Sequence, residues 1–344
     1  MPTGAEPASN DHTRADLAGP ACPVSVVTGF LGSGKTTLIG RVLRDPAFAR
    51  TAVIVNEFGE VGIDHALIAV GSEALLTLTT GCLCCRMQSD LATTLRGLAG
   101  AGGYDRVLIE TSGLVDPGPL LASLLGDREV TAAHRLCSVV TLVDAAAGAA
   151  TLDRHIEARR QVAVADRIVL TKTDLVGPVP DLRARLATVA PVLESVRGAV
   201  DPALLFAQAD PAARAGRLAG LAPGGGASPF ARGRHGAGLG SAVLERDRPI
   251  AGAALSLFLE ALLANTGPRL LRLKGLVEIV EAPGRPLLLQ AAQHGLAPLE
   301  WLDAWPPGWE GGSRLVLIGQ DLPPFFPARL LAAVEEEVAD AAGA

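Results

Sequence analysis

The feature that most constrains this chain of 344 residues is a short glycine-rich stretch, GFLGSGKTT, at residues 29–37. It follows an apolar run, PVSVV, and precedes a run with helical spacing, LIGRVL. The apolar run predicts a buried strand, and the later run predicts a helix. Glycines between them allow the tight turn that joins the two. The stretch therefore predicts a strand, a loop and a helix in direct succession, which is the local order of α/β folds.

The same nine residues have the spacing of a phosphate-binding loop, a glycine, then four residues, then Gly-Lys-Thr. In such a loop the backbone N–H groups and the helix N-terminus attract phosphate oxygens. Lys35 can reach the β- and γ-phosphates of a nucleotide, and the Thr36 hydroxyl can bind Mg²⁺. An ordinary glycine-rich turn is the alternative, but the chain has only three lysines among 30 basic residues and places one here. The residues predicted to hold the phosphates are Gly29, Gly32, Ser33, Gly34, Lys35, Thr36 and Thr37.

Further apolar segments have the length of buried strands and end in polar residues. Their sequences are TAVIV, RVLIE, CSVVTLV and RIVL. Segments with helical composition lie between them, for example 86–99 and 151–165. Strands that alternate with helices predict a mostly parallel sheet, whose ligands bind at the carboxyl ends of the strands. We therefore expect an α/β fold of the P-loop NTPase class.

The stretch TKTD, residues 171–174, directly follows the strand RIVL and indicates which base is bound. GTPases commonly carry Asn-Lys-x-Asp at this place. The carboxylate of Asp174 could accept hydrogen bonds from the ring N–H and the amino group of guanine, while the stem of Lys172 lies along the base. Thr171 stands in place of the usual Asn, which makes the preference for GTP over ATP less strict. The alternative is a helix cap, because Thr and Asp both cap helices well.

Glu110 ends the apolar strand of the stretch VLIETSG, residues 107–113. An acid at this place in P-loop enzymes commonly binds Mg²⁺ or a water on it. The alternative is a solvated acid at the end of a strand. Glu110 and Lys35 are therefore candidate catalytic residues.

The last third of the chain differs in composition. APGGGASPFARGRHGAGLG, residues 222–240, is rich in Gly, Ala and Pro and predicts a linker. Strand-like and helical segments then follow in the order strand, helix, three strands, helix, which predicts a small α+β domain with helices on one face of an antiparallel sheet. The predicted division is a disordered tail at 1–22, a P-loop GTPase domain at 23–210, a flexible linker at 211–240 and a C-terminal domain at 241–344.

The net charge of −6 argues against broad binding to nucleic acid, which requires a basic surface. No uninterrupted apolar run is long enough for a membrane span, and the N-terminus does not read as a secretory signal. These observations predict a cytoplasmic protein. Five cysteines, an odd number, make paired disulfides unexpected in that compartment.

Three of the five cysteines lie within four positions, as Cys82, Cys84 and Cys85 of the stretch TGCLCCRM. Three thiolates favour Zn²⁺ or Co²⁺ over Mg²⁺ and leave a coordination position open. Adjacent side chains of a straight strand point to opposite faces, so the two neighbouring cysteines reach one ion only if the chain turns. A redox pair and buried packing residues are the alternatives.

Together these stretches resemble the CobW-like family of P-loop metallochaperone GTPases (the CobW/HypB/UreG type). The resemblance rests on GFLGSGKTTL, VNEFGEVGID, GCLCC, ETSGLVDPGP and ADRIVLTKTDL in this order, and on LLRLKGLVEI and SRLVLIG near the C-terminus. It implies a CobW-like C-terminal domain. It also implies a protein that hydrolyses GTP, binds Zn²⁺ or Co²⁺ and delivers the metal to a client metalloprotein. A homodimer is allowed.

The resemblance assigns the metal to Cys82, Cys84 and Cys85. It also implies that the loop NEFGEVGID lies beside the nucleotide and the metal and acts as a switch. Glu57 could then complete the metal shell or position water, and Glu60 is a similar candidate. A solvated acidic loop is the alternative.

Two further points follow from the resemblance. Many relatives carry a histidine-rich run in the linker, whereas this linker contains only His235, so metal storage there is not expected. Lys274 lies in the Lys-Gly signature of the C-terminal domain, and its spacing assigns it no chemistry.

The alternative function of the protein is a nucleotide-dependent sensor of metal or redox state that delivers no metal.

Overall fold

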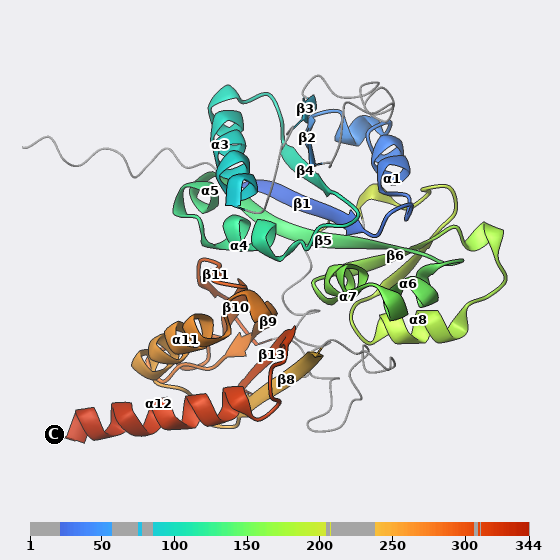
Figure 1. Cartoon of the computed structure of the whole chain (residues 1–344). Helices are drawn as coiled ribbons and strands as arrows, with labels where there is room; N and C mark the ends of the chain where they lie inside the picture. The colour runs from blue at the N-terminus through green and yellow to red at the C-terminus, as the bar shows by residue number, and fades with distance from the viewer. Residues whose placement is uncertain are drawn as a thin grey trace, which may run out of the picture.

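A computed structural model describes most of the chain (Figure 1). The described residues are 21–56, 75–77, 85–203, 207, 238–305, 309 and 311–343. Within these ranges the chain forms two sheets of different kinds.

The first sheet contains seven strands, and all neighbouring strands in it are parallel. In the order β3-β2-β4-β1-β5-β6-β7, its strands are Leu75–Thr77, Thr51–Asn56, Arg106–Thr111, Cys22–Gly29, His134–Asp144, Arg167–Thr171 and Val192–Ser195. The predicted parallel α/β fold is therefore confirmed. β1 begins at Cys22, one residue before the predicted start of its domain, and β3 and β7 were not predicted.

Helices cover both faces of this sheet, which explains why its strands are apolar on both sides. The helices are α1 (Lys35–Val42), α3 (Cys85–Ala101), α4 (Gly118–Gly126), α5 (Arg128–Ala133), α6 (Gly148–Arg154), α7 (Ile156–Ala163) and α8 (Pro180–Ala187). Alternate residues of one strand enter different cores: Val24 and Val26 pack with α3 to α8, and Val27 packs with α1.

The predicted helix 151–165 is wrong in one respect, because the structure has two helices there. α6 ends at Arg154 and α7 begins at Ile156, and His155 between them is extended. The ring of His155 instead packs against Phe30, with 4.5 Å between the ring centroids. A contact with a residue far away in the sequence thus accompanies this break.

The second sheet contains six strands and is antiparallel. The strands are β8 (Leu239–Arg246), β9 (Leu270–Val277), β10 (Leu287–Ala292), β11 (Gly295–Leu296), β12 (Glu300–Trp301) and β13 (Ser313–Gln320). Helices α11 (Gly252–Thr266) and α12 (Phe326–Gly343) pack with one face of it around the fully buried Phe258. The predicted order of strand, helix, three strands and helix is confirmed, and the short β11 and β12 are additions to it.

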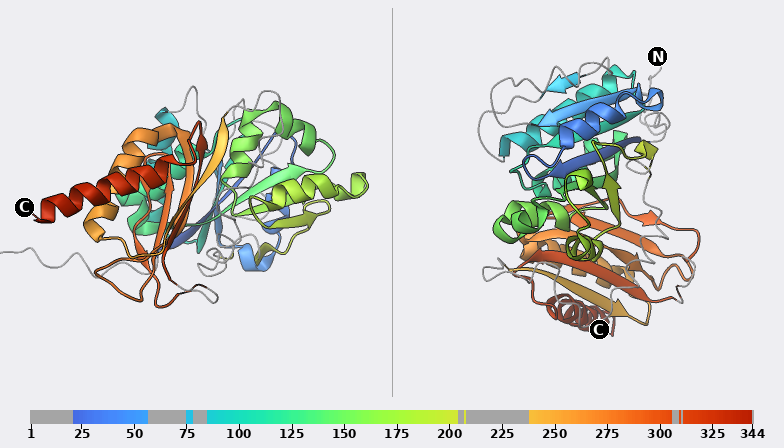
Figure 2. Two further views of the ribbon diagram at one scale, coloured as in Figure 1. Left: turned by 90° about the horizontal axis from the view of Figure 1, so that it is seen from below. Right: turned by 90° about the vertical axis from the view of Figure 1, so that its right-hand side faces the viewer.

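The opposite face of the antiparallel sheet lies against the first unit (Figure 2). Leu239, Leu271 and Ala292 of the second sheet belong to the apolar core of the parallel-sheet unit. Asp166, just before β6, binds both Arg272 and Lys274 of β9 through its carboxylate. The structure therefore gives Lys274 a partner that its sequence spacing did not suggest. The domain boundaries given above remain a prediction.

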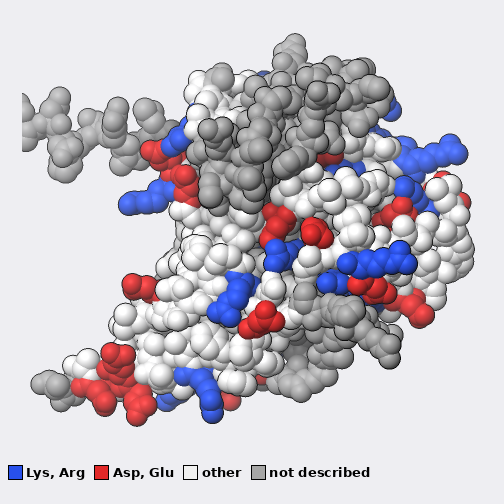
Figure 3. Space-filling view, in the orientation of Figure 1, with Lys and Arg blue, Asp and Glu red and all other residues white. Residues whose placement is uncertain are grey.

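Charges of both signs are interspersed on the face shown in Figure 3. Within the described ranges, no helix combines the length and the apolar composition that a membrane span requires.

We predict that His134 makes the stability of the fold depend on pH. The residue is 2% exposed, and burial lowers the pKa of His134 from its ordinary value of 6.5. The unfolded chain then binds the proton more readily than the folded chain. The contribution of His134 to the free energy of unfolding is therefore fully present above about pH 6.5. At lower pH it falls, by at most about 1.4 kcal/mol per pH unit.

Thermal unfolding of wild type and His134→Gln between pH 7.5 and 5.5 checks this prediction. The melting temperature of His134→Gln should fall less between pH 7.5 and 5.5 than that of the wild type. His294→Gln, at an exposed position, should show the same fall as the wild type. Equal pH profiles for wild type and His134→Gln would contradict the assignment.

Candidate functional site

The parallel sheet brings the carboxyl ends of its strands to one edge, where five predicted or newly recognised residues meet. Gly29 ends β1, Asp144 ends β5, Thr171 ends β6 and Ser195 ends β7. Glu110 is the penultimate residue of β4. Ligands of parallel sheets bind at this edge, and the sequence predicts the nucleotide site there.

The glycines of the loop adopt backbone angles that other residues avoid. Gly32 has a φ of 72° and Gly34 has a φ of 94°. Gly29 has no room for a side chain, because a Cβ there would lie 2.5 Å from the carbonyl oxygen of Leu142. Gly34 precedes α1 without a capping side chain, so the first N–H groups of the helix are available to an anion.

Lys35 is 9% exposed and folds back over the loop. Its Nζ donates to the carbonyl oxygen of Gly29 at 2.9 Å and to that of Phe30 at 3.4 Å. The ammonium therefore lies at the loop, where phosphate oxygens could replace these carbonyls as acceptors. The buried hydroxyl of Ser33 has no hydrogen-bond partner among the described residues, which is the condition expected of a group that awaits a ligand.

Thr36 and Glu110 meet although 74 positions separate them. The hydroxyl of Thr36 donates to Oε1 of Glu110 at 3.1 Å, and Glu110 is 5% exposed. A hydroxyl and a carboxylate are the oxygen donors that Mg²⁺ prefers, so these residues fit that ion. Thr37, the next predicted residue, is exposed.

Thr171 contacts the phosphate loop through its side chain. It is 4% exposed, and its hydroxyl donates to the carbonyl oxygen of Ser33 at 2.8 Å, with the Val143 carbonyl oxygen at 3.2 Å as a second acceptor. The side chain thus ties β6 to the phosphate loop. Its predicted contact with the nucleotide remains a prediction.

Lys172 adopts the left-handed conformation with a φ of 58°. Its Nζ donates to Oδ2 of Asp144 at 2.7 Å. Burial alone would raise the pKa of Asp144, but hydrogen bonds from Lys172, Ala146 and Ala147 outweigh it and lower that pKa below its ordinary value. Asp144 is therefore ionised at neutral pH and holds Lys172 beside Asp174. The prediction from the sequence did not include Asp144, although it ends an apolar strand at the same edge.

Asp174 faces a loop that the prediction also missed. Nε of Arg197 lies 4.0 Å from Oδ2 of Asp174, and the Arg197 carbonyl oxygen accepts from Arg41 of α1 at 3.4 Å. The buried hydroxyl of Ser195, where this loop begins, has no partner within the described ranges. The loop of residues 195–198 therefore adds Arg197 to the polar surroundings of Asp174. The available signal was the apolar stretch PVL, which precedes them as earlier strands precede the other site residues.

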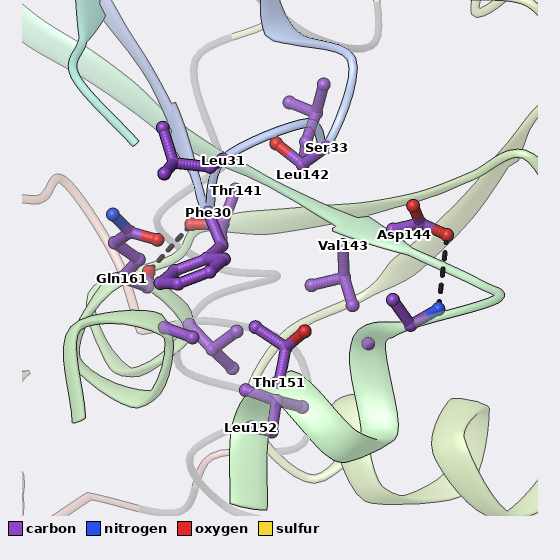
Figure 4. Close-up of a pocket in the computed structure, with 14 residues that line it drawn as sticks. Phe30, Leu31, Ser33, Thr141, Leu142, Val143, Asp144, Thr151, Leu152 and Gln161 are labelled. Carbon is purple, nitrogen blue, oxygen red and sulfur yellow. Dashed lines mark hydrogen bonds between the residues drawn. The ribbon is translucent and has the colours of Figure 1, made fainter. Parts of the chain in front are cut away.

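A pocket of about 40 Å³ lies beside the phosphate loop (Figure 4). Its walls include Phe30, Val143, Thr151 and Gln161. This volume holds a few water molecules but no nucleobase, and the pocket adjoins the predicted nucleotide site, because Ser33 and Asp144 also line it.

Several predicted residues lie outside the described residues: Glu57, Glu60, Cys82 and Cys84. Cys85 begins α3, but its side chain also lies outside the description. In the part of the chain that is described, no group of three or more His, Cys, Asp or Glu is placed to hold a metal ion. The metal ligands and the acidic loop therefore remain predictions.

The two other cysteines lie on the strands of the parallel sheet. Cys137 is buried in β5, and Cys22 begins β1. Burial and the neighbouring Cys137 raise the pKa of Cys22 to about 11, so its sulfur is a thiol at neutral pH. This thiol is a poor nucleophile and a poor metal ligand.

Two family models match the chain in succession. Residues 23–197 match the CobW/HypB/UreG nucleotide-binding domain, and residues 239–336 match the C-terminal domain of the cobalamin synthesis protein CobW.

Curated proteins are similar over most of their length. The zinc chaperone YjiA of Escherichia coli is 35% identical over 309 residues, which cover 87% of this chain and 94% of YjiA. The zinc chaperone CobW of a Sinorhizobium species is 33% identical, over 86% of this chain and 92% of the relative.

The fold is also similar to solved structures. The crystal structure of the Zn(II)-bound YjiA GTPase from E. coli has a TM-score of 0.65 and 28% identity, over 91% of this chain and 99% of that one. A Zn(II)-bound triple mutant of YjiA, in which alanine replaces one glutamate and two cysteines, matches equally well.

We predict that the hydroxyl of Thr171 supports nucleotide binding through the loop. Thr171→Val retains the shape of the side chain but leaves two buried carbonyl groups without this donor, which costs about 1–3 kcal/mol. We expect the melting temperature to fall by about 5 °C and the Kd for GDP to rise about five- to tenfold, measured with a fluorescent GDP analogue. Thr171→Ser keeps the hydroxyl and should bind GDP nearly as wild type does. Unchanged GDP affinity in Thr171→Val would show that the contact is dispensable.

Proposed function

Because the chain belongs to the CobW/HypB/UreG family of nucleotide-binding proteins, we propose that this P-loop GTPase binds Zn²⁺ or Co²⁺ and transfers it to a client metalloprotein. In this proposal Cys82, Cys84 and Cys85 hold the metal. GTP binding and hydrolysis then change the affinity of that site.

One observation carries the nucleotide part of the proposal: the contact between Thr36 and Glu110. It joins the start of α1 to the end of β4 at 3.1 Å and so places two oxygen donors beside the phosphate loop. Magnesium bound there would neutralise phosphate charge and polarise the bond to be broken. The fit of this donor set to a hard cation supports the proposal.

The residues of the loop perform the remaining binding work. The ammonium of Lys35 exchanges its backbone acceptors for phosphate oxygens and stabilises negative charge on them. The N–H groups at the start of α1 hold the same oxygens in place, which orients the terminal phosphate toward attacking water. Glu57 and Glu60 are the proposed groups for positioning that water.

The base is proposed to lie between Lys172 and Asp174. Asp144 holds the ammonium of Lys172, so the lysine stem is directed rather than free to rotate. The Asp174 carboxylate accepts two hydrogen bonds from guanine. Adenine lacks this pair of donors, so GTP is favoured.

The cargo part of the proposal is supported by the names of the relatives and by thiolate chemistry. YjiA and CobW are named zinc chaperones, and a YjiA structure contains Zn(II). Three thiolates bind Zn²⁺ or Co²⁺ strongly yet leave one position open for a ligand from a client. Such a site can pass the metal on by exchange of ligands.

We predict that Asp174→Asn changes base preference. The amide replaces one acceptor with a donor, so it repels the guanine amino group but matches the carbonyl group that xanthine carries there. GTP affinity should fall roughly 100-fold, and xanthosine triphosphate should bind better than GTP. Calorimetric titration with both nucleotides tests this expectation. If Asp174→Asn retains the wild-type preference, the guanine site lies elsewhere.

We further predict that Cys84→Ala weakens metal binding and its dependence on nucleotide. Loss of a group that only supports a ligand costs 10–100-fold, so the loss of a thiolate should cost about 100-fold or more. The measurement is competitive titration of the reduced protein with Co²⁺ and Zn²⁺, in the apo, GDP and non-hydrolysable GTP states. The Co²⁺–thiolate charge-transfer absorption reports the ligands.

The matched control is Cys22→Ala, whose sulfur is a thiol at neutral pH and should not affect the titration. Total zinc content alone is a poor test, because a YjiA variant lacking two cysteines was still found with Zn(II). Wild-type affinity in Cys84→Ala would contradict the assignment of the motif. A metal affinity that is the same in the apo, GDP and GTP-analogue states would contradict coupling between the metal and nucleotide sites, because such coupling is reciprocal. If the protein binds metal tightly and nucleotide changes that affinity, but no metal reaches a client, the alternative function of a metal or redox sensor would be favoured.

A further inference from the structure

One segment, residues 112–126, runs from the phosphate loop to the antiparallel sheet. It consists of the loop after β4 and of helix α4, and we refer to it as the coupling segment. At its start, Gly113 lies against the phosphate loop so closely that a Cβ there would be 2.7 Å from the backbone nitrogen of Leu31. Glu110 stands only three residues earlier. A change at the nucleotide site therefore reaches the start of this segment directly.

At its other end the coupling segment touches the second sheet through backbone atoms. A Cβ on Gly126 would lie 2.8 Å from the Cα of Gly295, and a Cβ on Gly295 would lie 2.2 Å from the carbonyl oxygen of Ala122. Figure 1 shows α4 facing β10 and β11. With no side chain between them, the helix and the strands cannot approach further, and a shift of one is passed to the other.

Two neighbouring side chains of α7 hold the middle of the segment. Gln161 is fully buried, and its Nε2 donates to the carbonyl oxygen of Gly113 at 3.0 Å and to that of Val115 at 3.2 Å. Its backbone carbonyl accepts from Thr141 at 2.7 Å, as Figure 4 also shows. Gln161 is therefore tied to β5 through its backbone carbonyl and to the loop beside the phosphate site through its side chain.

Arg160 joins three elements at once. One guanidinium nitrogen donates to Oδ2 of Asp116 in the coupling segment at 2.9 Å, and the other donates to Oε1 of Gln320 at the end of β13. About a quarter of each side chain of the ion pair is exposed, so the contact is only partly screened by water. Arg160 thus connects the antiparallel sheet to the loop that Gln161 holds. A shift of the sheet would therefore move this loop.

A second contact at this interface acts as an anchor. Asp166 accepts from the backbone N–H of Val139 at 2.9 Å and also binds Arg272 and Lys274 of β9. It stands before β6, whereas the nucleotide site lies at the other end of that strand. The buried anchor fixes one side of the interface, and the coupling segment is a further point of contact.

We propose that Gln161 and Arg160 are positioning residues, which set the loop 112–116 against the phosphate loop according to the placement of the antiparallel sheet. The C-terminal sheet thereby adjusts the rate of GTP hydrolysis without touching the nucleotide. This inference rests on the GTPase activity proposed above. It also predicts the converse, that the nucleotide state alters the β10–β11 edge of the sheet.

Steady-state GTP hydrolysis of three variants tests the proposal. Gln161→Ala should lower kcat about tenfold or more, while the Kd for GDP stays within about threefold. Gln320→Ala keeps the Arg160–Asp116 pair, removes only the link to β13, and should change kcat by about threefold or more at unchanged GDP affinity. Arg160→Lys keeps the charge but cannot span both partners, and it should resemble Gln320→Ala. The matched control is Arg183→Ala, which removes an exposed ion pair with Glu194 away from the interface.

Hydrogen exchange provides the second readout and does not depend on turnover. In the wild type, a non-hydrolysable GTP analogue should change exchange in residues 287–296 relative to GDP, and Gln320→Ala should abolish most of that difference. The proposed coupling is wrong if two results occur together. The first is that Gln320→Ala and Arg160→Lys have the same kcat as Arg183→Ala. The second is that hydrogen exchange in residues 287–296 is the same with GDP and with the GTP analogue. A wild-type protein that hydrolyses no GTP would instead contradict the proposed function, so the two failures can be told apart.

Discussion

The close packing of the phosphate loop on the ends of β5 and β6 is the constraint on which the rest of the site depends. Gly29 leaves no space before the Leu142 carbonyl, and the hydroxyl of Thr171 fastens the loop at Ser33. Three strands and the loop are thereby locked in one arrangement. Thr36, Glu110, Lys172 and Asp174 acquire their relative positions from this arrangement and not from contacts with one another alone.

The local parts of this structure could be predicted from the sequence. The longer strands and helices α1, α3, α11 and α12 follow from apolar spacing, and the loop follows from its glycines, because both depend on residues close together in the chain. The brace at Thr171 could not be predicted in this way. In the sequence, Thr171 stands where GTPases commonly carry an Asn near the base. Its hydrogen-bond partner, the carbonyl of Ser33, is 138 positions away.

Long-range contacts also explain the other differences. The helix over 151–165 is interrupted where His155 meets Phe30, which is a contact that no local pattern contains. Asp144, Gln161 and residues 195–198 were missed because their roles depend on which strands become neighbours. The cysteine motif and the acidic loop, by contrast, are known here only as sequence, and the proposal for metal binding depends on their chemistry and on the relatives.

The three lysines show how composition and structure agree. Each ammonium meets compact oxygen acceptors: backbone carbonyls for Lys35, Asp144 for Lys172 and Asp166 for Lys274. Lysine presents one compact ammonium on a flexible stem, whereas arginine spreads its donors over a planar fork. In a chain that otherwise uses arginine, these positions retain lysine.

The glycine contact between α4 and the second sheet limits how the two units of such proteins can be recombined. Side chains at an interface can adjust to a new partner by changing rotamers, but Gly126 and Gly295 meet through backbone and cannot. A chimera that joins this parallel-sheet unit to the C-terminal unit of a relative would need a matching glycine pair to dock at the same distance. The two units are therefore expected to be interchangeable only as a matched pair.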